Sequence, residues 1–164
     1  MRTSISRRRL GLAALTGFTG LTGVASTAFA PAAHAGRIGR LERNKRTVVA
    51  FYTLAFNGKR AQEAVNRYAG PQYIQHNPLF ADGTKAFVDA VTAFTTQNPQ
   101  VHVDIRTVIA EGDRVLTHSL ITLNPSDRGT VAADIFRLER GRIVEHWDVV
   151  QAFPETSVND HPMF

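Results

Sequence analysis

Hydrophobic residues recur at helical spacing in three segments of the chain, over residues 41–56, 59–68 and 84–96. The first stripe is the clearest, and its inward positions are Val48, Phe51, Tyr52 and Ala55. Each segment is followed by residues that end helices: Asn57-Gly58, Ala69-Gly70-Pro71 and Asn98-Pro99. The pattern therefore predicts three helices in the first part of the chain.

After Pro99 the period changes from 3.6 to 2, which is typical of strands with one buried face. A first strand is expected from Val101 to the turn at Glu111-Gly112-Asp113. Three more are expected over residues 114–123, 130–139 and 142–151. The fold class is thus α+β: three N-terminal helices packed on one face of a curved antiparallel sheet of about four strands. A curled sheet covered by helices encloses a cone-shaped cavity.

The first 35 residues have the organisation of an export signal. Arginines at positions 2, 7, 8 and 9 precede the mildly apolar segment Leu10–Ala30, and Ala33-His34-Ala35 fits a cleavage site. Ser6-Arg7-Arg8-Arg9-Leu10 favours a twin-arginine signal over an ordinary secretory one. We therefore expect a signal peptide over 1–35, one domain over 36–154 and a loose tail over 155–164. The mature protein is expected to be secreted, without stable membrane insertion.

Removing the signal changes the charge balance. The chain has 19 Lys and Arg against 14 Asp and Glu, and the signal holds four arginines and no acid, which leaves 15 against 14. Nucleic-acid binding therefore loses its electrostatic support. Since the chain has no cysteine, disulfides and lipoprotein attachment are excluded as well.

The hairpin over residues 134–151 carries the strongest candidate chemistry. It places Asp134, His146, Trp147 and Asp148 in the middle of its strands. Asp134 is the first candidate, because Phe136 and Leu138 share its face and an apolar wall disfavours the charged carboxylate, which suits a proton acceptor and donor. The alternative is an aspartate that is hydrogen-bonded to a neighbour and has no catalytic role.

Strand register decides what faces Asp134. A plain two-residue turn at Arg140-Gly141 would place Asp134 opposite Trp147. A turn that ends in a Gly-type bulge would place it opposite His146, with Asp148 on the same face. We favour the bulge, because a two-residue primed turn prefers Asn, Asp or Gly where Arg140 stands. Trp147 then points to the outer face as a dimer contact.

Three segments carry a resemblance to a known family: Tyr73-Ile74-Gln75-His76-Asn77-Pro78, Glu111-Gly112-Asp113-Arg114-Val115 with His118, and Asp134-Ile135-Phe136-Arg137 with Gly141 and Glu145-His146-Trp147-Asp148. Together they resemble the SnoaL-like polyketide cyclase family of the NTF2-like superfamily, over roughly residues 43–153. The resemblance implies a cone fold and a homodimer formed through the outer sheet face. It also implies that Asp134 takes a proton from a carbon next to a carbonyl, while His118 holds the substrate or steers the proton.

The remaining candidates are substrate-binding residues. Tyr73, His76 and Asn77, together with Gln75, precede Pro78 and are expected either to rim the cavity mouth or to satisfy their own turn. Phe136, His146 and Asp148 are expected to complete the cavity wall. No His or acidic pair has recognised metal-ligand spacing, so no metal is expected. No Gly-rich phosphate loop is present, and no cofactor is expected.

These observations predict an exported SnoaL-like protein that performs cofactor-free acid/base catalysis on a small, apolar or polyketide-like carbonyl compound. The reaction class is aldol cyclisation, isomerisation or related lyase chemistry. Two alternatives stay open: a non-catalytic module that binds a small molecule in the same cavity, and a dimeric interaction protein.

Overall fold

The computed structural model describes residues 30–164, so the predicted signal peptide lies outside the described residues up to position 29. The helical elements are α1 (Ala30–Tyr52), the short π-helix η1 (Thr53–Asn57), α2 (Ala61–Tyr68) and α3 (Thr84–Gln97), and one strand stands between α2 and α3 in the chain. The strands are β1 (Ala69–Gln75), β2 (His102–Glu111), β3 (Arg114–Thr122), β4 (Thr130–Glu139) and β5 (Arg142–Ala152). Among residues 30–164, no helix has the length and hydropathy needed to span a bilayer.

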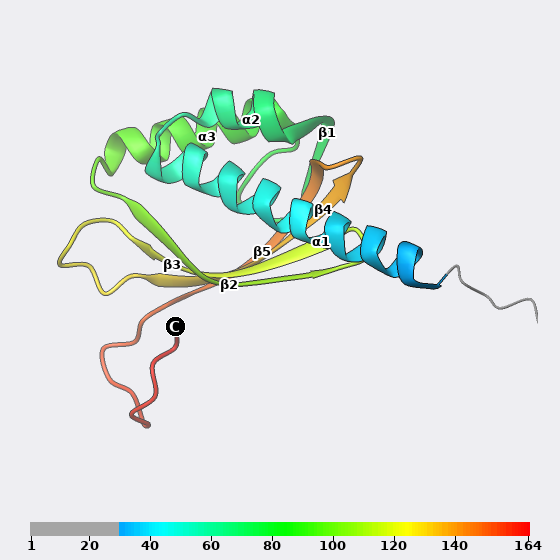
Figure 1. Cartoon of the computed structure of the whole chain (residues 1–164). Helices are drawn as coiled ribbons and strands as arrows, with labels where there is room; N and C mark the ends of the chain where they lie inside the picture. Colours follow the sequence, from blue (N-terminus) through cyan, green and yellow to red (C-terminus); the bar gives the residue numbers. More distant parts are fainter. Residues whose placement is uncertain (1–29) are drawn as a thin grey trace, which may run out of the picture.

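The strands form one sheet in the order β1-β5-β4-β3-β2, and the helices cover one of its faces (Figure 1). The predicted α+β architecture is confirmed, but the sheet is mixed and has five strands. β1 pairs in parallel with β5, whereas the other neighbours are antiparallel. β1 escaped the sequence analysis because it is a short edge strand that contains Pro71 and lacks period-2 alternation.

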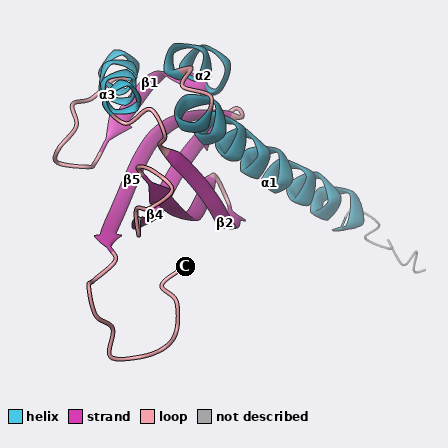
Figure 2. Ribbon diagram, turned by 90° about the vertical axis from the view of Figure 1, so that its left-hand side faces the viewer, coloured by secondary structure: helices cyan, strands magenta, loops and turns pink. Residues whose placement is uncertain are grey.

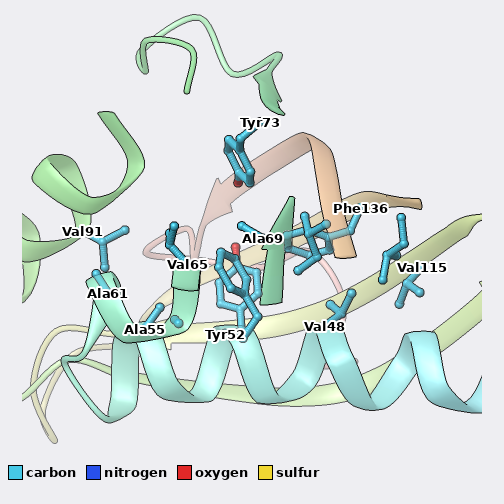
Figure 3. Close-up of a cluster of buried hydrophobic side chains, with 14 of the residues drawn as sticks. Val48, Tyr52, Ala55, Ala61, Val65, Ala69, Tyr73, Val91, Val115 and Phe136 are labelled. Atoms are coloured by element: carbon cyan, nitrogen blue, oxygen red, sulfur yellow. The ribbon is translucent and has the colours of Figure 1, made fainter. Parts of the chain in front are cut away.

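Aromatic side chains join the helices to the sheet. Phe51 is fully buried, stacks on Phe87 at 5.0 Å between ring centroids and meets the edge of Phe136 on β4 at 6.3 Å. Tyr52 packs edge-on against Phe136 at 5.3 Å. Figure 3 shows Tyr52 and Val48 reaching from α1 toward the sheet. The helical stripe predicted from the sequence is therefore the face that α1 buries.

The β4–β5 hairpin corrects the predicted register. Arg140 and Gly141 both have positive φ, at 51° and 78°, and form a plain two-residue turn between Glu139 and Arg142. The bulge lies further along β5, because Leu138 pairs with Ile143 and the next pair joins Arg137 to Glu145.

The pairing of Asp134 therefore shifts by one residue from Trp147 toward the C-terminus of β5, whereas the prediction shifted it toward the N-terminus. Asp134 pairs with Asp148, and His146 pairs with Phe136. The predicted grouping on one face holds all the same, because Asp134, His146 and Asp148 all lie on the inner face. Trp147 pairs with Ile135 and stacks on His76 at 4.5 Å, outside the core.

The C-terminal residues after β5 form no helix or strand and lie on the side of the sheet away from the helices (Figures 1 and 2). The last residue, Phe164, returns to the outer sheet face. The Arg106 guanidinium lies 4.4 Å from its ring centroid, and the His118 ring lies 6.0 Å away.

A matched pair of valines tests the core. Val115 on β3 is fully buried, whereas Val158 in the tail is fully exposed. We expect Val115→Ala to lower the free energy of unfolding by roughly 2 kcal/mol, since it removes buried methyl groups and leaves a cavity. Val158→Ala should change it by less than about 0.5 kcal/mol. Urea denaturation of both variants measures the difference, and equal losses would contradict the described core.

Candidate functional site

Asp134 lies at the centre of a buried hydrogen-bond network and is 1% exposed. The Tyr52 hydroxyl donates to its Oδ1 at 2.6 Å, and the Thr117 hydroxyl donates to its Oδ2 at 3.3 Å. The Nε2 of His146 lies 3.2 Å from Oδ1. These partners come from α1, β3 and β5, so the carboxylate joins three elements to its own strand. A buried carboxylate requires such partners to offset its lost hydration.

The partners of His146 fix which ring nitrogen carries a proton. Its Nδ1 lies 3.1 Å from Oε1 of Gln75, and the backbone N–H of Asn77 donates to the same oxygen at 2.9 Å. An atom that already accepts a backbone N–H is an amide oxygen, which accepts and never donates. Nδ1 is therefore the donor. The contact between Nε2 and Asp134 then requires one further proton, which the imidazole and the carboxyl share.

Asp148 brings a second carboxylate to this pair. It lies directly across from Asp134, and ligand atoms of Asp134, His146 and Asp148 all fall within 4.8 Å of one another. The Asn77 side-chain amide donates to both oxygens of Asp148, at 2.8 and 3.0 Å. Asp148 therefore places a second carboxylate beside the contact between His146 and Asp134. We call Asp134, His146 and Asp148 the proton cluster.

A cavity of about 70 Å³ adjoins the proton cluster. Its lining residues are Tyr52, Phe56, Gln75, Phe80, Ala81, Phe87, Ala90, Val91, His146 and Asp148. Asp134 lies behind Tyr52 and His146 instead of forming the wall itself. The cavity has room for only a few waters. The segment between β1 and α3 contributes Phe80, which is half-exposed, and Ala81 to the wall.

Two tyrosines present hydroxyl groups to the cluster. Figure 3 shows the hydroxyl oxygens of Tyr52, from α1, and Tyr73, from β1, directed toward one another. Burial, followed by the negative charge of Asp134, raises the pKa of both hydroxyls, so both remain protonated donors. The Tyr73 hydroxyl is buried and, among residues 30–164, has no hydrogen-bond partner. It is therefore a free donor close to the proton cluster.

The structure brings together most of the residues predicted from the sequence. Asn77 holds Asp148, the Phe136 ring lies 4.8 Å from that of His146, and the Tyr73 ring is stacked over His146 at 6.4 Å. Tyr73, Asn77, Phe136, His146 and Asp148 thus surround Asp134.

Two predicted residues lie elsewhere. The side chain of His118 is on the outer sheet face against Phe164, and Thr117, one position earlier, contacts Asp134 instead. His76 stacks on Trp147 and bonds Glu145 at 2.9 Å, away from the cavity. His118 therefore cannot hold substrate beside Asp134, as the family resemblance implied.

Two members of the network were not singled out as site residues from the sequence: Tyr52 and Thr117. Tyr52 was recognised as an inward residue of the helical stripe, but its partner is 82 positions away. A buried tyrosine normally bonds through its hydroxyl, and this was the one available signal.

A divalent cation is a possible alternative occupant of the proton cluster, since one imidazole and two carboxylates suit zinc or similar metals. However, His146 and Asp134 are in direct contact, and Asp148 already accepts two hydrogen bonds from Asn77. A cation between the three side chains would have to separate His146 from Asp134. The existing contacts fit proton transfer more directly than metal binding.

Comparison with known proteins agrees with this geometry. Residues 48–146 match the model of the SnoaL-like domain, and this span covers more than half of the chain. The chain belongs to the SnoaL-like domain family. No curated protein is significantly similar to this SnoaL-like domain in sequence.

Solved structures share its fold at low identity. A candidate polyketide cyclase from Bacillus cereus ATCC 10987 is 22% identical, with a TM-score of 0.57 over 66% of this chain and 74% of its own. A candidate isomerase of the SnoaL-like family from Agrobacterium tumefaciens is 17% identical, with a TM-score of 0.54 over 66% and 98%. An NTF2-like protein of unknown function from Mesorhizobium loti is 21% identical, with a TM-score of 0.57 over 69% and 94%. These likenesses establish the NTF2-like fold.

The two tyrosines give a matched test of the network. Tyr52→Phe removes a donor to a buried carboxylate and should lower the free energy of unfolding by about 1.5–3 kcal/mol. Tyr73→Phe removes a hydroxyl without a partner and should change it by less than about 0.5 kcal/mol, or raise it. Chemical denaturation of both variants gives the comparison. A larger loss for Tyr73→Phe would show that its hydroxyl is bonded in the native protein.

Proposed function

We propose that this SnoaL-like domain catalyses proton transfer at a carbon next to a carbonyl group, in a small and mostly apolar compound, without a cofactor. The observation that carries the proposal is the 3.2 Å contact between His146 Nε2 and Asp134 Oδ1 beside a cavity that His146 and Asp148 line. A group that can both take and give a proton at its site is what such chemistry requires. Aldol cyclisation, isomerisation and related lyase reactions all begin with this step.

Each residue of the cluster has a role in the proposal. Asp148 faces the cavity and takes the proton from carbon, while the electron pair moves to the carbonyl oxygen as an enolate forms. The Tyr73 hydroxyl, which is a free buried donor, supplies the hydrogen bond that stabilises the negative oxygen. His146 and Asp134 hold the second proton and return one to carbon or oxygen as the product forms. Phe87 and Val91 supply the apolar side of the cavity.

Export and dimerisation belong to the same proposal. The arginines and cleavage site of residues 1–35 support secretion of the mature protein. The outer sheet face supports a homodimer, because β3 and β4 present Leu116, Leu120 and Ile135 on it and the neighbouring strand β5 presents Trp147. Phe164 lies on this face, so a partner would pack around the tail or displace it.

Hydrogen–deuterium exchange at carbon tests the chemistry without knowledge of the natural substrate. Small methyl and cyclic ketones in D₂O should incorporate deuterium next to the carbonyl faster when the full-length protein is present. Asp134→Asn and Asp148→Asn should each reduce the acceleration by about 100-fold or more, since acid/base groups contribute on this scale. Mass spectrometry of the ketones gives the rates.

Two controls define the result. Asp89→Asn removes an exposed carboxylate on α3 and should leave exchange unchanged. Tyr73→Phe should slow exchange by roughly 10- to 1,000-fold, as the loss of a single oxyanion donor does, while its stability is retained. If the protein binds the ketones but does not accelerate exchange, the result contradicts catalysis and favours the alternative of a non-catalytic binding module. Undiminished exchange in Asp134→Asn would remove the proton cluster from the mechanism.

A further inference from the structure

A second and larger cavity, of about 720 Å³, lies away from the proton cluster. Its lining residues are Arg40, Arg43, Asn44, Thr47, Gly112, Asp113, Leu138, Arg140 and Gly141. They come from residues 40–47 of α1, from the end of β4 at Leu138, and from the two hairpin turns, β2–β3 and β4–β5. The volume falls within the range of small-molecule sites. We call it the arginine cleft.

Positive charge dominates the arginine cleft. Arg40, Arg43 and Arg140 are exposed, and within residues 30–164 none of these guanidinium groups has an ion pair or a hydrogen bond. The single acid of the lining, Asp113, lies 3.7 Å from Arg114. The chain beyond residue 35 has nearly balanced charge, so three unpaired arginines at one cavity are a local feature.

A buried amide is part of the same wall. Asn44 is 4% exposed, and its side chain makes no hydrogen bond with any residue of the described part of the chain. The fully buried side-chain atoms without a partner in residues 30–164 are the Tyr73 and Ser119 hydroxyls, so the small exposed surface of Asn44 includes its amide, which is open to the cleft. Its N–H groups add donors that do not depend on charge.

Arg140 occupies a backbone position that disfavours it. With φ at 51° it stands in the left-handed region, where Gly, Asn or Asp avoids a cost of about 1–2 kcal/mol. The backbone conformation therefore gives no reason for an arginine at this position. The Arg140 side chain lines the arginine cleft, to which α1 contributes Arg40 and Arg43.

We propose that the arginine cleft binds a small molecule that carries two or more phosphate or carboxylate groups. Guanidinium groups bind both oxyanions through paired N–H donors. Three of them around one cavity exceed what a single carboxylate needs, which indicates a multiply charged ligand. The site is independent of the proton cluster, and its ligand is recognised by charge, whereas the proposed substrate is mostly apolar.

Calorimetric titration of the full-length chain with pyrophosphate and with citrate tests the proposal, at about 0.15 M salt to screen weak surface attraction. At least one of the two should bind with a stoichiometry of one. Arg43→Gln and Arg140→Gly should each weaken that binding about tenfold or more, as expected for lost charge-assisted hydrogen bonds. Arg140→Gly should also unfold at the same or a higher temperature, because glycine suits the left-handed turn.

Arg46→Gln is the matched control, since it removes the same charge from the same helix but does not line the cleft. It should change the dissociation constant by less than about twofold. Equal weakening by Arg43→Gln and Arg46→Gln would reduce the effect to general charge attraction and overturn the site. So would the absence of saturable binding of either anion. Preference for pyrophosphate or for citrate assigns the ligand to the phosphate or the carboxylate class.

Discussion

The hydrogen bond from the Tyr52 hydroxyl to the Asp134 carboxylate joins the helical layer to the sheet at the centre of the domain. Asp134 is 1% exposed, and a carboxylate without partners at that depth would cost several kcal/mol. Three elements besides its own strand therefore have to meet it in one arrangement: α1 through Tyr52, β3 through Thr117 and β5 through His146. The same arrangement sets the cavity beside α1 and α3, so the fold and the candidate chemistry depend on one buried charge.

The β5 bulge determines which side chains can join this carboxylate. Without the extra residue after Ile143, Trp147 and not Asp148 would stand opposite Asp134, since a shift of one residue sends every side chain to the other face. The parallel edge strand β1 then supplies Gln75, whose amide oxygen fixes the orientation of His146. Together these two irregular features of the sheet place His146 between Gln75 and Asp134.

Hydrophobic periodicity predicted the helices and the last four strands within a few residues, apart from the N-terminal extension of α1. It also predicted the buried stripe of α1, because burial of large side chains dominates the energetics at that level. Periodicity could not predict which of the two alternating sets of β3 side chains faces the core. Leu116 and Leu120 beside His118 form the more apolar set, yet Val115, Thr117 and Ser119 point inward. The network needs the Thr117 hydroxyl inside, and a partner or the tail can cover the leucines outside.

The hairpin register was missed for a different reason. The turn at Arg140-Gly141 is the plain two-residue type, despite the poor suitability of arginine for it, and the bulge falls where no glycine marks it. The conformational cost of arginine in this turn is outweighed by tertiary contacts of the folded domain. Turn propensities read from a single sequence do not include such contacts. The parallel strand β1 is likewise determined by its partner on β5, more than 70 positions away, and not by its own polar sequence.

Neutron diffraction from deuterated crystals tests the central claim most directly, because it locates the protons of the buried cluster. The account predicts a deuterium on Nδ1 of His146 directed at Gln75, and one further deuterium between Nε2 and the Asp134 carboxyl. An unprotonated Nδ1, or a contact between Nε2 and Asp134 that holds no deuterium, would contradict the shared proton and the proposed chemistry with it.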